Sequence, residues 1–209
     1  MVSKQYDQKG FKDIDARSEL NVHLKQSPDY SIRIEGEENL LKLLKVYTEK
    51  DRLVITVREK INIDPTKPIE VYISSPEFRN LEGSGACNLN TEGGIKGNEL
   101  KLSLSGASNA DLDVEANKLS IDASGATDVK LKGKVVYLSV DGSGNTNVQA
   151  FPLVADNTEV EISGAGSAEV WANQSLKVDI SGAADVRYKG SPASIKKEVS
   201  GAGNITQVP

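Results

Sequence analysis

Acidic side chains recur three residues before the glycine of a repeated Ser-Gly pair, and carboxylate oxygens are preferred calcium ligands. Five consecutive members, here called the acidic stripe, are Asp122, Asp141, Glu161, Asp179 and Glu198. Apolar residues flank each acid, so the alternation predicts that the acids point outward. On stacked strands about 4.8 Å apart, these like charges repel one another.

We interpret the acidic stripe as part of a solvated face whose negative charge is balanced by nearby basic side chains. The candidates for this role are Lys101, Lys130, Lys177, Arg187 and Lys196. Two alternatives stay open: a row of weak calcium sites, or a docking stripe for a basic partner. No metal or cofactor is otherwise expected.

A second polar column lies three residues after each Ser-Gly pair. It consists of Asn88, Asn109, Asp128, Asn147, Ser167, Asp185 and Asn204, with Asn21 at the corresponding place in an earlier segment. Such side chains bond turn backbone, and stacked amides can bond one another in a ladder. We favour this structural role, and the alternative is a row of sugar-binding groups.

The recurring serine does not predict a catalytic nucleophile. A serine nucleophile needs a base within hydrogen-bond reach, and the only histidine, His23, cannot serve seven serines. A polysaccharide lyase or hydrolase needs carboxylates clustered on adjacent coils, whereas Asp128 and Asp185 would lie three coils apart, roughly 14 Å at strand spacing. No catalytic residue is predicted, and the chain is not expected to be an enzyme.

The spacing of the Ser-Gly pairs predicts the architecture that positions these columns. Their glycines, here called the turn glycines, are Gly85, Gly106, Gly125, Gly144, Gly164, Gly182 and Gly201. Apolar residues alternate on both sides of each pair, which is typical of half-buried strands. Two short strands cannot bury their apolar face alone, so successive repeats must stack. We predict an all-β fold, a right-handed parallel β-helix with coils of about 19 residues and a tight turn at each glycine.

Residues 1–80 are less regular than residues 81–209. The segment 14–24 overlays on 121–131, with Ser18 in the glycine position, and is interpreted as a degenerate coil. Residues 37–48 are predicted to form a short amphipathic helix, and 52–58 and 69–74 to form strands separated by a turn at Pro65 and Pro68. We expect this part to continue or cap the solenoid within one continuous domain.

Composition narrows the range of functions. The net charge of −5 and pI near 5.1 argue against nucleic-acid binding. No stretch approaches 18 apolar residues, so no membrane span is expected. The single cysteine, Cys87, allows no intrachain disulfide, and the first residues lack the apolar centre of a signal peptide. Phe151 and Trp171 are predicted to be neighbours on successive coils, where corner packing is favoured over stacking on a sugar ring.

Several segments together resemble a known bacterial family. They are I-D-A-x-x-x-L-x-V-x-L at 14–24, ENLL at 38–41, RLVITVRE at 52–59, IEVYISSPEF at 69–78 and the serial S-G-A turns. This combination resembles the family called "putative auto-transporter adhesin, head GIN domain". The resemblance implies a β-helix similar to pectin-lyase-like folds, no catalytic site, export to the cell envelope and a role in adhesion. Arg17-Ser18 departs from the family's Ser-Gly pattern.

The function expected from these observations is non-enzymatic binding at the cell envelope or cell surface, in the form of adhesion. The partner would be a glycan or protein of a host or of a cell surface, and the export signal would already be removed. One alternative is a polysaccharide lyase or hydrolase on the same fold. The other is a self-assembling scaffold, a homo-oligomer, because little sequence follows the last coil to cap its edge.

Overall fold

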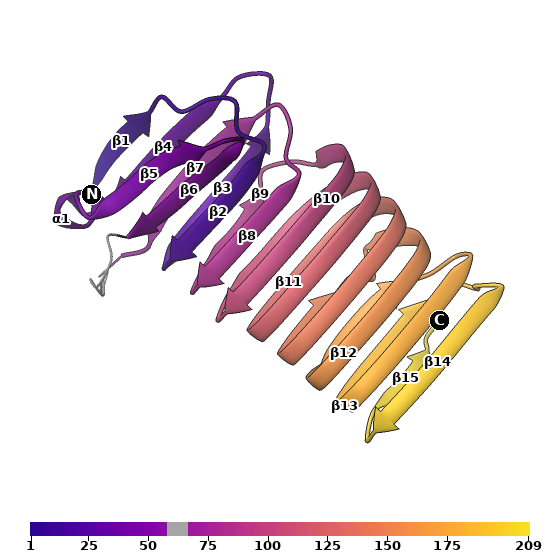
Figure 1. Cartoon of the computed structure of the whole chain (residues 1–209). Helices are drawn as coiled ribbons and strands as arrows, with labels where there is room; N and C mark the ends of the chain where they lie inside the picture. The colour runs from indigo at the N-terminus through magenta and orange to yellow at the C-terminus, as the bar shows by residue number, and fades with distance from the viewer. Residues whose placement is uncertain (58–66) are drawn as a thin grey trace.

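The computed structural model of the chain describes residues 1–57 and 67–209 and is an elongated solenoid of strands (Figure 1). The strands are β1 (Val2–Tyr6), β2 (Asp13–Ser18), β3 (Leu20–Gln26), β4 (Ser31–Gly36), β5 (Leu44–Glu49), β6 (Arg52–Val57), β7 (Ile69–Ser75), β8 (Asn80–Gly85), β9 (Asn88–Thr91), β10 (Ile95–Gly106), β11 (Asn109–Gln149), β12 (Leu153–Trp171), β13 (Ser175–Lys189), β14 (Ser194–Gly201) and β15 (Asn204–Gln207). The helix α1 covers Glu38–Leu41. The longest strand, β11, passes through two Ser-Gly turns, which is why a single strand covers both faces of the solenoid.

Successive coils pair in parallel with the turn glycines in register. Gly106 pairs with Gly85 and Gly125, and Gly164 pairs with Gly144 and Gly182. The predicted parallel β-helix is therefore confirmed, with its tight turns stacked on one edge. Each coil contributes a strand before the glycine to one face, here called the pre-turn face, and a strand after it to the other, the post-turn face.

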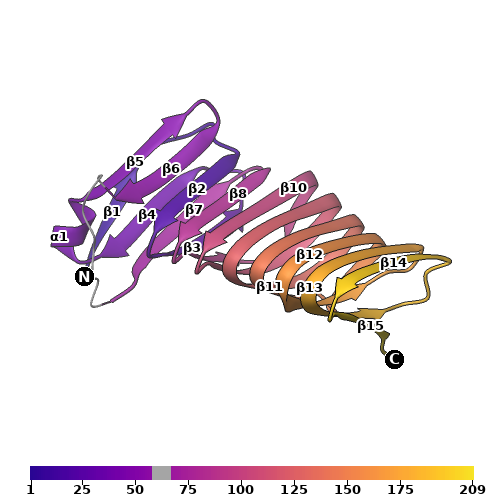
Figure 2. The same ribbon diagram turned by 60° about the horizontal axis from the view of Figure 1, so that its bottom comes forward.

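The coil formed by β2 and β3 is not at the end of the stack, although it comes first in the sequence. β2 pairs with β8 on one side and β6 on the other, and β3 pairs with β9 and β7 in the same way. The outermost strands are antiparallel: β5 lies along β6, and β4 lies between β7 and β1. Figure 2 shows this antiparallel group at the N-terminal end of the solenoid.

The helix predicted over 37–48 is wrong in its second half. Only Glu38–Leu41 is helical, and Leu44–Glu49 is strand β5, paired antiparallel with β6. The apolar residues at 40, 41 and 44 fit a helical period, but Val46, Tyr47 and Thr48 favour strands. Pairing with β6 satisfies the backbone hydrogen-bonding groups of these residues and therefore favours the strand conformation over the helix.

The two strands predicted after this segment are confirmed where the structure describes them. They are observed as Arg52–Val57 and Ile69–Ser75. The predicted turn at Pro65 and the strand residue Arg58 lie outside the described residues. Among the described residues, no helix has the length and apolar character that crossing a membrane requires.

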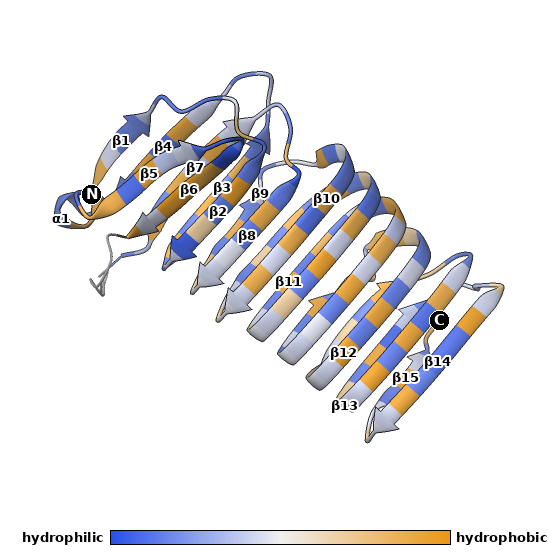
Figure 3. Cartoon of the chain, viewed as in Figure 1, coloured by the Kyte–Doolittle hydropathy of each residue, from blue (hydrophilic) through white to orange (hydrophobic). Residues whose placement is uncertain are grey.

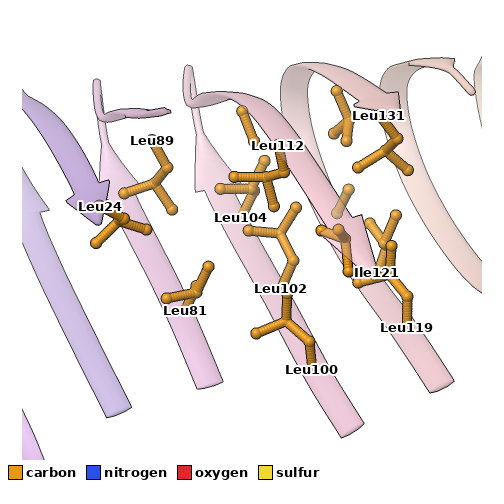
Figure 4. Close-up of a cluster of buried hydrophobic side chains, with 14 of the residues drawn as sticks. Leu24, Leu81, Leu89, Leu100, Leu102, Leu104, Leu112, Leu119, Ile121 and Leu131 are labelled. Atoms are coloured by element: carbon orange, nitrogen blue, oxygen red, sulfur yellow. The ribbon is translucent and has the colours of Figure 1, made fainter. Parts of the chain in front are cut away.

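One hydrophobic core runs through the whole stack. Side chains four residues before the turn glycines form a fully buried column: Leu81, Leu102, Ile121, Val140, Val160 and Val178. Figure 3 shows the resulting alternation of apolar and polar residues along each strand, and Figure 4 shows leucines of successive coils packed against one another. Burial of such columns supplies the main driving force for folding.

A third column, which the sequence analysis overlooked, lies inside the turns two residues after each glycine. Ser108 Oγ donates to the carbonyl of Ser105 at 2.9 Å, and Thr146 Oγ1 donates to that of Ser143 at 3.2 Å. Cys87 occupies the same place, with Sγ 3.4 Å from the carbonyl of Ser84. Burial raises the pKa of the Cys87 thiol to about 11, so the thiol stays protonated at neutral pH. Cys87, Ser108 and Thr146 each place a polar atom against a carbonyl of their own turn, whereas the equivalent residues of the later coils, Gly166, Ala184 and Gly203, have no polar side chain.

The turn glycines meet two separate steric demands. Gly125 and Gly164 have φ of +95° and +127°, which a side chain adopts only at a cost. A Cβ at Gly125 would also lie 2.4 Å from the carbonyl oxygen of Gly106 on the neighbouring coil. Ser18, in the glycine position of the first coil, has φ of +105°, so this turn keeps the same conformation without glycine.

The last described coil places a charge in the core column. Lys197 pairs with buried Val178, and its ammonium group lies 4.8 Å over the ring of Tyr188. β14 and β15 each pair only with β13, which leaves Ile195 and Val199 about half exposed. An inward-pointing charge on an edge strand is a recognised device against edge-to-edge association.

Replacing Gly125 or Gly164 with alanine should lower the free energy of unfolding by more than about 1 kcal/mol, because the side chain is strained at positive φ and collides with the neighbouring turn. Urea unfolding measures this change. Gly97→Ala is the matched control, since a Cβ there meets nothing within 4 Å. Equal stability of all three variants would contradict the steric account of the turns.

Replacing Lys197 with valine should increase self-association, because it completes an apolar row from Ile195 to Val199 on an unpaired edge. Sedimentation velocity over a range of concentrations measures this effect. Lys196→Val is the control on the same strand, because Lys196 points outward and pairs with Glu198 at 2.7 Å. Association of the unaltered protein through β14 would show that Lys197 does not protect this edge.

Candidate binding site

The acidic stripe lies on the pre-turn face as one row. Asp141, Glu161, Asp179 and Glu198 pair in register across four coils. Three acids of the stripe have lysine partners: Lys101 contacts Asp122 at 2.5 Å, Lys177 contacts Glu161 at 3.1 Å and Lys196 contacts Glu198 at 2.7 Å. Within the described residues, Asp141 and Asp179 have no ion pair.

The ion pairs change the ionisation of the groups that form them. Hydrogen bonding to Asp122 raises the pKa of Lys101, and hydrogen bonding to Lys196 lowers the pKa of Glu198. Lys130 and Arg187, which were expected to help balance the stripe, lie instead on the post-turn face, where Arg187 pairs with Glu169. The balance on the pre-turn face therefore comes from a column of lysines two positions before the acidic column. Lys196 contacts the acid of its own coil, whereas Lys101 and Lys177 contact acids of neighbouring coils.

A hollow of about 480 Å³ lies at the N-terminal end of the pre-turn face. Its acidic lining includes Asp15, Glu82, Asp122 and Asp141. Asp15 is buried and accepts two hydrogen bonds from Arg17, at 2.9 and 2.6 Å. In the part of the chain that the structure describes, no three His, Cys, Asp or Glu side chains gather into a group able to hold a metal ion. The described residues therefore provide no set of ligands for the calcium sites that were considered from the sequence.

The polar column on the post-turn face is a hydrogen-bonded ladder, as the structural interpretation predicted. Asn88 Nδ2 donates to Asn21 Oδ1 at 2.8 Å, and Asn109 Nδ2 donates to Asn88 Oδ1 at 2.9 Å. Further along, Asn147 Nδ2 donates to Asp128 Oδ1 at 3.0 Å. The side chains of this ladder therefore bond mainly to one another.

A polar and aromatic cluster closes the ladder at its N-terminal end. Glu70 accepts hydrogen bonds from Asn21 at 2.8 Å and lies 2.7 Å from His23 Nε2. The His23 ring stacks on Tyr72 with centroids 4.7 Å apart, and the Arg33 guanidinium lies 4.0 Å over the Tyr72 ring. Glu70 and Tyr72 from β7 hold His23 half-buried, and the irregular N-terminal sequence had not indicated this pairing.

The next outward column, two residues further along each strand, differs from the ladder. On four successive coils it contains Asn90, Asp111, Lys130 and Gln149, whereas further along the same column Glu169 and Arg187 form an ion pair. Among the described residues, none of these four side chains has a hydrogen bond or ion pair. Their polar groups are therefore available to a molecule that binds to the face.

Two adjoining hollows follow this unpaired column. One, of about 650 Å³, extends from Asn21 and His23 to Gln149, and the other, of about 480 Å³, extends from Asp111 to Glu169. Both are lined by Asp111, Lys130 and Gln149, so we treat them as one post-turn groove. The groove is the candidate binding site, because it combines concave shape with unpaired polar side chains.

Phe151 and Pro152 form an apolar end to the post-turn groove. The ammonium group of Lys189 lies 5.1 Å from the centre of the Phe151 ring. The neighbouring Trp171 donates from Nε1 to Asn173 Oδ1 at 2.8 Å, which agrees with the predicted packing of this residue at the corner of the coil.

Comparison with known proteins places the chain among adhesin-like proteins. Residues 10–192 match the family described as "Putative auto-transporter adhesin, head GIN domain". The chain belongs to this family. The head GIN assignment confirms the resemblance seen in the sequence, over nearly the whole chain. No curated protein matches the chain.

Solved structures share the head GIN fold of this chain. A protein described as a putative adhesin from Bacteroides fragilis is similar at 25% identity and a TM-score of 0.95, covering 99% of this chain and 96% of that one. A protein described as a putative adhesin from Parabacteroides merdae has 23% identity and a TM-score of 0.72, covering 100% and 96%. A Parabacteroides distasonis protein described as a putative lipid binding protein has 22% identity and a TM-score of 0.81, covering 100% and 96%.

Replacing Asp141 with asparagine should stabilise the protein by a few tenths of a kcal/mol, roughly 0.3, at low salt, because it removes an unpaired charge between two acids. Thermal unfolding measures the change, and high salt should abolish it. Asp122→Asn is the matched control and should not stabilise, because Asp122 has Lys101 as its partner. Calcium and sodium chloride at equal ionic strength should act alike. A larger response to calcium would show that the stripe binds this ion.

Proposed function

We propose that the protein is a non-enzymatic adhesin that is exported to the cell envelope and binds its partner through an outward face of the solenoid. The observation that carries the proposal is the post-turn groove, where the polar side chains of Asp111, Lys130 and Gln149 are exposed and have no partner in the described part of the chain. Membership of the head GIN family supports the same function.

The architecture suits a binding surface because it is rigid across its length. Every coil pairs with its neighbours, so side chains on the outer face keep fixed spacings. A ligand that binds such a face meets groups already held in place, which lowers the entropy cost of association.

An enzymatic function on the same fold, such as polysaccharide cleavage, has less support. Asp111 and Asp128 line the groove, but Asp128 belongs to the ladder and accepts a hydrogen bond from Asn147. The equivalent position on the coil next to Asp111 is occupied by Lys130 and not by a second carboxylate. Among the described residues, no two carboxylates of this groove form a pair suited to act as general acid and general base. The lining supports recognition better than cleavage.

Antibody fragments raised against the folded protein should label intact cells of the producing bacterium. Added soluble protein should reduce the attachment of those cells to mucin and to extracellular matrix, because it competes for the same partner. Flow cytometry and adherent-cell counts measure the two effects, with heat-denatured protein as the control competitor. Labelling that appears only after permeabilisation would contradict export, and unchanged attachment would contradict adhesion.

A further inference from the structure

We propose that the post-turn groove binds a neutral linear polysaccharide, laid along the solenoid axis across successive coils. The inference rests on the proposed surface-binding function and adds the chemical class of the ligand. It begins from the contrast between two adjacent columns on one face. Ladder side chains from Asn21 to Ser167 are hydrogen-bonded to one another, whereas Asn90, Asp111, Lys130 and Gln149 have no side-chain partner among the described residues.

The unpaired column offers the mixture of groups that hydroxyls require. Asp111 accepts hydrogen bonds, Lys130 donates them, and Asn90 and Gln149 do both. Asp111 and Lys130 occupy equivalent positions five residues after Gly106 and Gly125, on neighbouring coils, yet they form no ion pair. A sugar hydroxyl can bond to either group, because each hydroxyl donates once and accepts twice.

The coil repeat matches the geometry of an extended polysaccharide. Neighbouring strands lie about 4.8 Å apart, close to the length of one pyranose unit in an extended chain. A glycan parallel to the solenoid axis would therefore meet one member of the unpaired column for each successive sugar. Asn90, Asp111, Lys130 and Gln149 together would contact four units.

The apolar end of the groove supplies the second element of sugar recognition. Phe151 and Pro152 line it. The C–H face of a pyranose ring is apolar and packs on such surfaces, while its hydroxyl edge faces the polar groups.

The groove suits a neutral glycan better than a peptide or an acidic polymer. It lies on the face of a sheet whose backbone groups are already paired, so strand addition, the usual mode for extended peptides, has no free edge there. Its ionisable lining carries both signs: the acids are Glu70, Asp111, Asp128 and Glu169, and the bases are His23, Lys130 and Lys132. This near balance gives no attraction to a uronic acid polymer.

The experiment is a binding array on the full chain. The array carries neutral hexasaccharides of β-linked glucose, mannose and xylose, acidic oligogalacturonate and hyaluronan, and deglycosylated fibronectin and collagen. We expect binding to at least one neutral oligosaccharide. The double variant Asp111→Ala/Gln149→Ala should weaken that binding by about tenfold or more, as the loss of two hydrogen bonds implies.

Asp141→Ala is the matched control, because Asp141 is also an exposed and unpaired acid but lies on the pre-turn face. It should leave glycan affinity unchanged, and melting temperatures of all variants should show that they are folded. Equal effects of the groove and control variants would overturn the proposal, as would binding to the acidic polymers alone. Binding only to the deglycosylated proteins would also overturn it, while leaving the proposed adhesion intact. Binding to nothing on the array would refute the glycan ligand, and the cell-attachment experiment would decide on adhesion separately.

Discussion

The close approach of backbone to backbone at the stacked turns is the constraint on which this structure depends. A Cβ at Gly182 would lie 2.3 Å from the carbonyl oxygen of Gly164, and one at Gly201 would lie 2.3 Å from that of Gly182. From Gly106 onward, only glycine permits each turn to rest directly on the one before it. Because the turns are fixed one above another, the coils cannot slip in register, and every position of the repeat is aligned with its equivalents.

Because the columns are aligned, each side chain lies next to side chains of the same kind on neighbouring coils. The contacts that stabilise a column therefore depend on its chemistry. Apolar columns pack inward as the core. Amides on the post-turn face bond to one another, because a primary amide both donates and accepts. Carboxylates can only accept, so the acidic stripe depends on lysines in the adjacent column. Asn90, Asp111, Lys130 and Gln149 in the next column have no hydrogen bond or ion pair among the described residues, and they are the side chains proposed to meet a ligand.

The two ends of the solenoid are protected in different ways. At the N-terminal end, antiparallel strands β1, β4 and β5 lie outside the parallel coils. At the last described coil, Lys197 replaces an apolar residue of the core column and lies over Tyr188. Both devices limit the exposed strand edge that makes parallel stacks prone to association.

The repeat alone determined the solenoid, the inward and outward columns and the ladder, because each follows from a period of two along a strand and one glycine per coil. It could not determine where the coil of β2 and β3 lies, since strand order depends on which edges remain free once β6 and β7 have folded back. Tertiary pairing also converted residues 44–49 from a predicted helix into a strand, and brought Glu70 and Tyr72 to His23. Tertiary structure also decided which ion pairs form. Lys101 and Lys130 were both candidates from the sequence for balancing the acidic stripe, but only Lys101 lies on the face that carries the acids. Which polar groups remain free, and therefore where a ligand can bind, is a property of these contacts in space.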